Sequence, residues 1–286
     1  MSGNLLRRLA FSAVAIPAAV ALIYLGGWPL AALLAVAGCL GVREVYDFGA
    51  RLGIDPLRRS GMAAALLTPL ATYWAKGSEV HFAEPALYLA AVWLIAVVAL
   101  AAWRRGPGGK PLAAVAVTVF GAVYAGSLPA FALVLRHPSG VGPSSWVGAA
   151  LLLFPLAVTW IGDTAAYAGG TAIGGPKLAP TLSPRKTWAG ALAGLAFSLL
   201  AAGAYARWVL APAGRPVGLA AALAMGAAIA VAGQVGDVSE SVFKREVGLK
   251  DSSTLIPGHG GVLDRLDSLY FVLPVTAGLY HLFGVA

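Results

Sequence analysis

Charged residues and cysteine are both scarce in this chain. Asp, Glu, Lys and Arg make up 11% of the 286 residues, 59% are hydrophobic and the mean hydropathy is +0.80. Soluble domains carry about 25% charged residues, so this composition excludes an ordinary soluble domain and predicts an integral membrane protein. The single cysteine, Cys39, excludes an intramolecular disulfide, and cysteine usage therefore does not report the redox compartment.

Several patterns that would point to other functions are also missing. There is no Walker A pattern, which excludes a P-loop nucleotide fold, and no cluster of Cys and His, which disfavours zinc. The net charge of +8 does not predict nucleic-acid binding, because the basic residues sit in short loops between apolar stretches rather than along one face. No strong internal repeat is visible, which disfavours a transporter built on inverted repeats.

Apolar stretches recur along the chain, each close to the roughly 20 residues that a helix needs to cross a bilayer. The predicted fold class is all-α, a polytopic helical membrane protein with about nine transmembrane helices. Eight is the alternative, because two of the stretches are short. The expected spans lie near 9–25, 28–48, 60–75, 85–103, 111–135, 146–161, 188–206, 217–235 and 268–285.

The distribution of basic residues between alternate span ends predicts the topology. Sixteen of the 20 Lys and Arg residues fall on one side, and only Lys76, Arg136, Arg207 and Arg215 fall on the other. The positive-inside rule therefore places the N-terminus in the cytoplasm. Arg7 and Arg8 precede a long apolar run without a convincing cleavage site, so we expect a retained first span rather than a signal peptide.

The chain divides into N-terminal helices, 1–145, and a C-terminal catalytic region, 146–286. We expect the C-terminal region to hold two cytoplasmic active-site loops, 162–187 and 236–267, which contain nearly all the unusual polar residues. The first expected span after loop 162–187 begins near Gly190.

Few residues of the first half suggest chemistry. Arg43, Glu44 and Asp47 are spaced as an interfacial ion-pair cluster at a helix end. His81 and His137 are expected in external loops, exposed to water. In the second half, Gly190 and Gly194 are expected to permit close helix packing.

Four aspartates of the second half can converge at cytoplasmic span ends: Asp163, Asp237, Asp264 and Asp267. Asp264 and Asp267 are three residues apart, so in a helix both point to one face. Ligation by oxygen alone suits Mg²⁺, which joins carboxylates to substrate phosphates. The alternative is that these acids only pair with nearby Lys and Arg residues.

Hydroxyl and cationic side chains in the same two loops describe a polyphosphate site. Free backbone N–H groups at helix N-termini and glycine-rich turns add to such a site. The side chains are Ser183, Arg185, Lys186, Thr187, Lys244, Arg245 and Lys250.

At these residues the sequence resembles the phosphatidate cytidylyltransferase family, also called CDP-diacylglycerol synthases. The family's C-terminal signature is matched, with its spacing kept, at Ser241, Lys244, Arg245, Lys250, Asp251, Pro257, His259, Gly260, Gly261, Asp264, Arg265 and Asp267. The close resemblance covers about 160–268. The chain departs from the family at two positions: Arg185 stands where relatives commonly carry Lys, and Ala189 where they commonly carry an acid.

The resemblance implies an enzyme that makes CDP-diacylglycerol and pyrophosphate from CTP and phosphatidic acid, for phospholipid biosynthesis. It implies a homodimer in the cell (inner) membrane with its active site on the cytoplasmic side. It also implies Mg²⁺ and leaves open a second cation such as K⁺. By residue, it implies catalytic roles for Asp237, Asp264, Asp267, Lys244 and His259, substrate binding by Ser183, Arg185, Lys186, Thr187, Arg245, Lys250, Asp251 and Arg265, and metal binding by Asp163, Asp237, Asp264 and Asp267.

Two other functions stay open at this point. A transporter would use the charges as a pathway, but it predicts polar residues near span midpoints, and here they gather at one end. A CTP-dependent lipid kinase would use a similar site and transfer the γ-phosphate instead.

Overall fold

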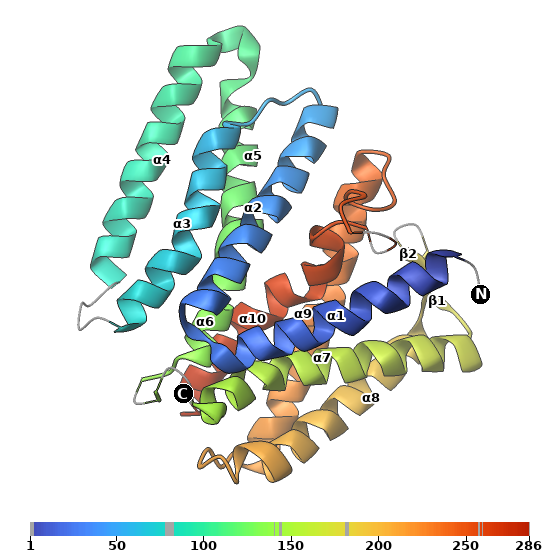
Figure 1. Cartoon of the computed structure of the whole chain (residues 1–286). Coiled ribbons are helices and arrows are strands. Elements are labelled where there is room, and N and C mark those ends of the chain that lie inside the picture. Colours follow the sequence, from blue (N-terminus) through green and yellow to red (C-terminus); the bar gives the residue numbers. More distant parts are fainter. Residues whose placement is uncertain are drawn as a thin grey trace.

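The computed structural model describes residues 3–77, 83–139, 141–142, 145–180, 183–256, 258 and 260–285, and most of these are helical (Figure 1). The helices are α1 (Gly3–Leu25), α2 (Gly27–Arg51), α3 (Arg58–Gly77), α4 (Ala83–Arg105), α5 (Pro111–Gly121), α6 (Phe131–Arg136), α7 (Trp146–Ala172), α8 (Trp188–Tyr205), α9 (Leu219–Glu246) and α10 (Leu263–Leu282). A π-helical segment, Ala122–Ser127, and a 3₁₀ turn, Leu128–Ala130, join α5 to α6. A second π-helical segment, Ala206–Leu210, extends α8. Strands β1 (Lys177–Ala179) and β2 (Ser183–Thr187) pair antiparallel between α7 and α8.

The all-α membrane class is confirmed, because every predicted span overlaps a helix. Six described segments are long and apolar enough to cross a membrane: Gly27–Arg51, Glu84–Arg105, Pro111–Arg136, Trp146–Ala172, Trp188–Leu210 and Leu219–Glu246. By the same measure α3 and α10 fall short, and the part of α1 that this measure covers, Ala13–Leu25, is a shorter apolar helix, so the total of nine crossings stays a prediction.

Two predicted helix ends are wrong. Helix α7 continues to Ala172 and α9 to Glu246, so both predicted loops, 162–187 and 236–267, begin too early. The glycines after residue 161 look like helix breakers in the sequence, but they lie where α8 packs tightly on α7. A Cβ at Gly190 of α8 would come within 2.7 Å of the Ala166 carbonyl oxygen of α7, which confirms the expected packing role of Gly190.

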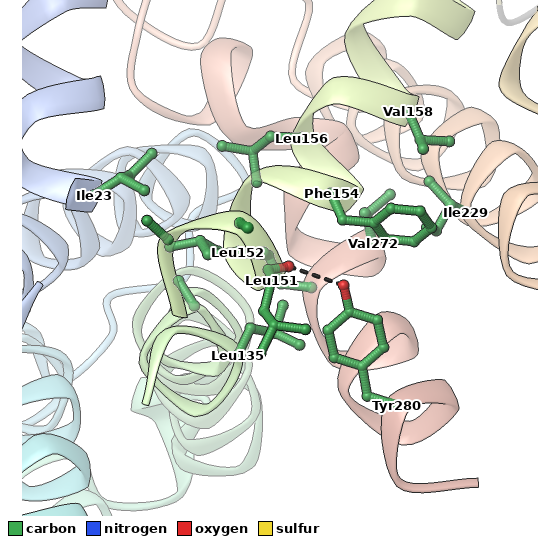
Figure 2. Packing of buried hydrophobic residues seen from close by; sticks show 14 of the residues in the cluster. Ile23, Leu135, Leu151, Leu152, Phe154, Leu156, Val158, Ile229, Val272 and Tyr280 are labelled. Carbon is green, nitrogen blue, oxygen red and sulfur yellow. Dashed lines mark hydrogen bonds between the residues drawn. The ribbon is translucent and has the colours of Figure 1, made fainter. Parts of the chain in front are cut away.

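The main hydrophobic core joins α7 to α9 and α10 (Figure 2). Leu151 and Phe154 of α7 are fully buried beside Ile229 of α9 and Val272 of α10. The Tyr280 hydroxyl of α10 donates a hydrogen bond of 2.9 Å to the Leu151 carbonyl oxygen (Figure 2). Within a bilayer, van der Waals packing and interhelical hydrogen bonds of this kind hold helices together, so the helices that carry the polar residues are fixed relative to one another.

The end of α6 is tied to the turn between α1 and α2. Arg136 is fully buried, and its guanidinium donates to the carbonyl oxygens of Ile23 and Tyr24, at 2.6 and 2.5 Å. His137 is also buried, and its Nε2 accepts a hydrogen bond of 3.0 Å from the Gly27 N–H. The expectation that His137 is exposed is therefore wrong, because the chain folds the α1–α2 turn over it. His81 lies outside the described residues.

The acceptor role of His137 requires an unprotonated Nε2, which makes stability depend on pH. Burial, followed by the charges of Arg136 and Lys76, lowers the pKa of His137 to about 4, from an ordinary value of 6.5. As the pH falls through 6.5, the unfolded chain takes up a proton before the folded one does, so stability is lost between about pH 6.5 and 4. We expect a loss of about 2 kcal/mol by pH 5.

Unfolding of the detergent-solubilised protein at pH 7.5 and pH 5, compared with a His137→Gln variant, measures this loss. Gln keeps a hydrogen-bond acceptor and does not titrate, so the variant should lose less stability on acidification. An equal loss in both proteins would contradict the assignment.

Candidate active site

Four parts of the chain meet at the polar end of the C-terminal region: α7, the β1–β2 hairpin, the last turns of α9 and the first turns of α10. Figure 1 shows the hairpin, the C-terminal end of α9 and the start of α10 toward the same side of the molecule. An ion pair of 2.5 Å between Lys186 of β2 and Asp237 of α9 links two of these parts directly. This end contains most of the predicted site residues.

Three of the four predicted metal ligands interact with one another. The charges of Asp163 on α7, Asp237 on α9 and Asp267 on α10 act on each other. Asp267 lies in the polar first turns of α10, ahead of the apolar stretch, and its carboxylate accepts a hydrogen bond from the Ser268 N–H at 2.6 Å. Burial, helped by the charge of Asp237, raises the pKa of Asp267 to about 6. Like charges at this range disfavour the ionised form of each acid.

The fourth predicted ligand, Asp264, has a different environment. Its Oδ1 accepts from Lys244 at 2.5 Å, and its Oδ2 accepts from the Ser252 N–H and hydroxyl at 2.7 Å and from the Gly261 N–H at 2.8 Å. Burial alone would raise the pKa of Asp264, but these hydrogen bonds hold it below its usual value. Lys244 also pairs with Glu240 one turn earlier, at 3.1 Å. Asp264 is therefore a satisfied, ionised carboxylate within a network that joins α9 to α10.

The four aspartates thus do not form one cluster. Within the part of the chain that the structure describes, no three His, Cys, Asp or Glu side chains are arranged to hold a metal ion by themselves. Asp163, Asp237 and Asp267 offer oxygen donors near one another, whereas Asp264 is occupied by Lys244 and the loop. The four predicted ligands thus differ in their hydrogen-bond partners, although Asp264 and Asp267 belong to the same motif.

The charged residues predicted to bind substrate, together with Lys244, fall into two groups. Five of them are exposed: Arg185, Arg245, Lys250, Asp251 and Arg265. Lys186 is partly exposed, with 26% of its side chain accessible, and Lys244 is nearly buried at 12%. The exposed bases are accessible to an anion, Lys186 is partly accessible and pairs with Asp237, and Lys244 is held inside the protein by two acids.

Two further predicted residues, Ser183 and Thr187, lie at the two ends of β2. Thr187 is buried and caps α8, since its hydroxyl oxygen accepts from the Gly190 N–H at 3.1 Å, so its side chain faces the helix rather than a substrate. Ser183 lies at the start of β2, opposite Ala179. His259 lies outside the described residues.

The structure also identifies polar residues that sequence reasoning missed. Glu44 of α2 was expected in an interfacial ion-pair cluster, but it is only 3% exposed and accepts hydrogen bonds from Ser252 and Ser253 in the loop before α10. Only the Asp47 part of the predicted cluster forms an ion pair, with Arg58 at 2.8 Å. The one sequence signal for Glu44 was an acid in an apolar helix, which does not reveal a partner some 200 positions away.

An apolar groove of about 730 Å³ leads to the polar end. Side chains of α1, α2, α7 and α10 line it, among them Leu33, Leu156 and Leu269. Asp163 and Arg265 are polar members of the same lining. The groove thus joins a surface suited to hydrocarbon with a carboxylate and an exposed guanidinium.

Comparisons with known proteins agree on one family. The sequence profile described as "Cytidylyltransferase family" matches residues 6–283. A protein of Synechocystis named phosphatidate cytidylyltransferase is 30% identical, with 94% of each chain covered. A protein of the same name from Brucella suis is 41% identical over 189 residues, which cover 66% of this chain and 62% of the relative.

A further similar protein, YnbB of Escherichia coli, is described as uncharacterized and is 42% identical over 128 residues, covering 45% of this chain and 41% of the relative. The chain therefore spans under two thirds of the Brucella relative but nearly the whole of the Synechocystis one. With a profile match that runs through almost all of its helices, this chain belongs to the cytidylyltransferase family.

Proposed function

We propose that the protein is a phosphatidate cytidylyltransferase, which transfers CMP from CTP to phosphatidic acid and releases pyrophosphate. The observation that carries the proposal is the similarity over 94% of both chains to the Synechocystis protein of that name. The site supports it with chemistry suited to both substrates. Exposed bases at the polar end suit phosphates, and the groove beside them suits acyl chains.

In the proposed reaction a phosphate oxygen of phosphatidic acid attacks the α-phosphorus of CTP. A new P–O bond forms, the bond from the α-phosphorus to the bridging oxygen breaks, and pyrophosphate leaves with the electron pair. The second pKa of a phosphomonoester is about 6, so the attacking group is largely ionised without a general base. The main obstacle is the repulsion between two polyanions.

The exposed bases reduce this repulsion. Arg185, Arg245, Lys250 and Arg265 are accessible and can neutralise phosphate oxygens of CTP and of the lipid. Lys186 is bonded to Asp237, and an incoming phosphate offers it a stronger anionic partner. Exchange of this partner would bring Lys186 onto the substrate and leave the Asp237 carboxylate free.

Mg²⁺ fits the released Asp237 carboxylate together with that of Asp267. It is usually held by one or two carboxylates together with substrate phosphates and waters, so it does not need three protein ligands. We assign its binding to Asp237 and Asp267, with Asp163 beside them, and leave Asp264 to Lys244. When bound there, Mg²⁺ would supply positive charge at the phosphates.

The proposed location is the cell inner membrane, with the site on the cytoplasmic side. Sixteen of the 20 Lys and Arg residues fall on the side of the chain that holds the site, which supports this orientation by the positive-inside rule. The resemblance to the family also supports a homodimer.

The first prediction from the proposed function concerns which phosphate of CTP reaches the lipid. Purified protein in mixed micelles with phosphatidic acid and Mg²⁺ should convert CTP labelled at the α-phosphorus into labelled lipid. The same assay with γ-labelled CTP should release the label as pyrophosphate. Label from the γ-position in the lipid would instead indicate a lipid kinase and overturn the proposal.

The second prediction concerns the crowded carboxylates. Asp237→Asn and Asp267→Asn each remove one negative charge from the proposed ion site, and we expect CMP transfer to fall at least about 100-fold. Asp55→Asn is the matched control, because Asp55 is 73% exposed and pairs with Arg105 outside the site. A Mg²⁺ titration of each variant checks the assignment, and near-normal turnover of Asp267→Asn at the parent's Mg²⁺ requirement would contradict it.

The third prediction separates Asp264 from Asp267 by stability. Asp264→Asn removes one of the two acidic charges beside Lys244 and weakens the hydrogen bonds that Asp264 accepts from Lys244, Ser252 and Gly261, so it should lower the free energy of unfolding by about 2 kcal/mol. Asp267→Asn removes a crowded charge and should leave stability unchanged or higher. Unfolding in mixed micelles with increasing SDS measures both, and an Asp264→Asn variant as stable as the parent would show that the buried network does not depend on this charge.

A further inference from the structure

Glu44 on α2 is a buried carboxylate in the half of the chain that the family signature does not cover. Both of its oxygens are used. Oε1 accepts from the Ser253 hydroxyl at 2.7 Å and the Val262 N–H at 3.0 Å, and Oε2 accepts from the Ser252 hydroxyl at 2.9 Å and the Leu263 N–H at 2.9 Å. Four donors thus converge on one carboxylate that is 3% exposed.

These donors belong to the loop before α10 and to its first turn. The Val262 and Leu263 N–H groups are among those that a helix start leaves without an intrahelical partner, and a carboxylate there also interacts favourably with the helix dipole. Glu44 therefore supplies from another helix the cap that the sequence of α10 lacks at Val262. The start of α10 is held against α2.

Ser252 connects Glu44 to the polar end of the site. Its hydroxyl lies 2.9 Å from Glu44 Oε2 and 2.7 Å from Asp264 Oδ2. A hydroxyl has one hydrogen, so it donates to one carboxylate at a time and couples the two. Gly261 packs against Ser252 and Glu44, and a Cβ at this position would collide with the Ser252 hydroxyl and with both oxygens of Glu44.

We propose that Glu44 is a positioning residue for CMP transfer: through Ser252 and the start of α10 it holds the loop, and with it Asp264 and Asp267, in the geometry that the reaction needs. The inference rests on the function proposed above. The hydrogen bonds to Glu44 come from Ser252, Ser253 and the first backbone N–H groups of α10, none of which is an exposed base, so Glu44 acts through the segment that it holds. A loop displaced by about 1 Å can cost about 100-fold in rate.

The test is the Glu44→Gln variant, with Glu84→Gln as the matched control because Glu84 is an exposed glutamate at the start of α4. Gln keeps the size of the side chain but turns one acceptor into a donor that faces N–H and hydroxyl groups. We expect the kcat of CMP transfer to fall about 10- to 100-fold while the KM for CTP changes by less than about threefold. The control should match the parent in both constants.

Amide hydrogen exchange gives a second readout that needs no substrate. In Glu44→Gln, peptides that contain Ser252–Ile256 and Gly260–Asp264 should exchange at least about tenfold faster than in the parent, while α8 stays unchanged. A solely structural role predicts equal loss of protection throughout the protein. If the variant cannot be purified folded, Ser252→Ala replaces it, because it removes the bridging hydroxyl and leaves Glu44 its other three donors.

The outcomes separate the two proposals. A variant with the parent's kcat and exchange overturns the role of Glu44, and so does a uniform loss of protection. A parent enzyme that transfers no CMP overturns the proposed function, whereas the exchange measurement still decides whether Glu44 holds the loop. Selective exchange together with a fall in kcat at constant KM supports the role.

Discussion

Lys244 lies between the carboxylates of Glu240 and Asp264 with 12% of its side chain exposed, and this arrangement joins α9 to α10. In a protein with so few charges, a buried cation persists only where acids neutralise it, and here two acids share one lysine. The connections continue from Asp264 to Ser252 and from Ser252 to Glu44 on α2. One continuous polar network therefore fixes three helices and the loop between two of them.

This network explains why residues of one motif have different environments. Asp264 and Asp267 are one helical turn apart, yet four donors surround Asp264, one of them the Ser252 hydroxyl that it shares with Glu44, whereas the charges of Asp237 and Asp163 act on Asp267. The buried residues of the network hold α2, α9 and α10 together. The crowded acids and the exposed bases are the groups with capacity left for a ligand, and in the proposed function that ligand is a polyphosphate with its cation.

The apolar groove adds a second requirement of a lipid enzyme. Its walls come from helices of both halves of the chain, and Asp163 and Arg265 belong to its lining. A reactant with hydrocarbon chains and a phosphate headgroup matches a groove that is apolar along its walls and charged where Asp163 and Arg265 line it. The N-terminal helices thus contribute a wall of the groove and the Glu44 anchor, and are more than a membrane support for the C-terminal region.

The membrane class, the helical segments and the family were determined by the sequence, because hydrophobic length and fixed motif spacing are local properties of the chain. The packing role of Gly190 was predicted for the same reason. Tertiary structure decided the rest: that α7 and α9 continue past their glycines and charges, that His137 is buried under the α1–α2 turn, that Asp264 is satisfied while Asp267 is crowded, and that Glu44 caps α10. Each of these depends on a partner that lies far away in sequence, and the burial and hydrogen bonding of a polar group are set by which partner the fold brings to it.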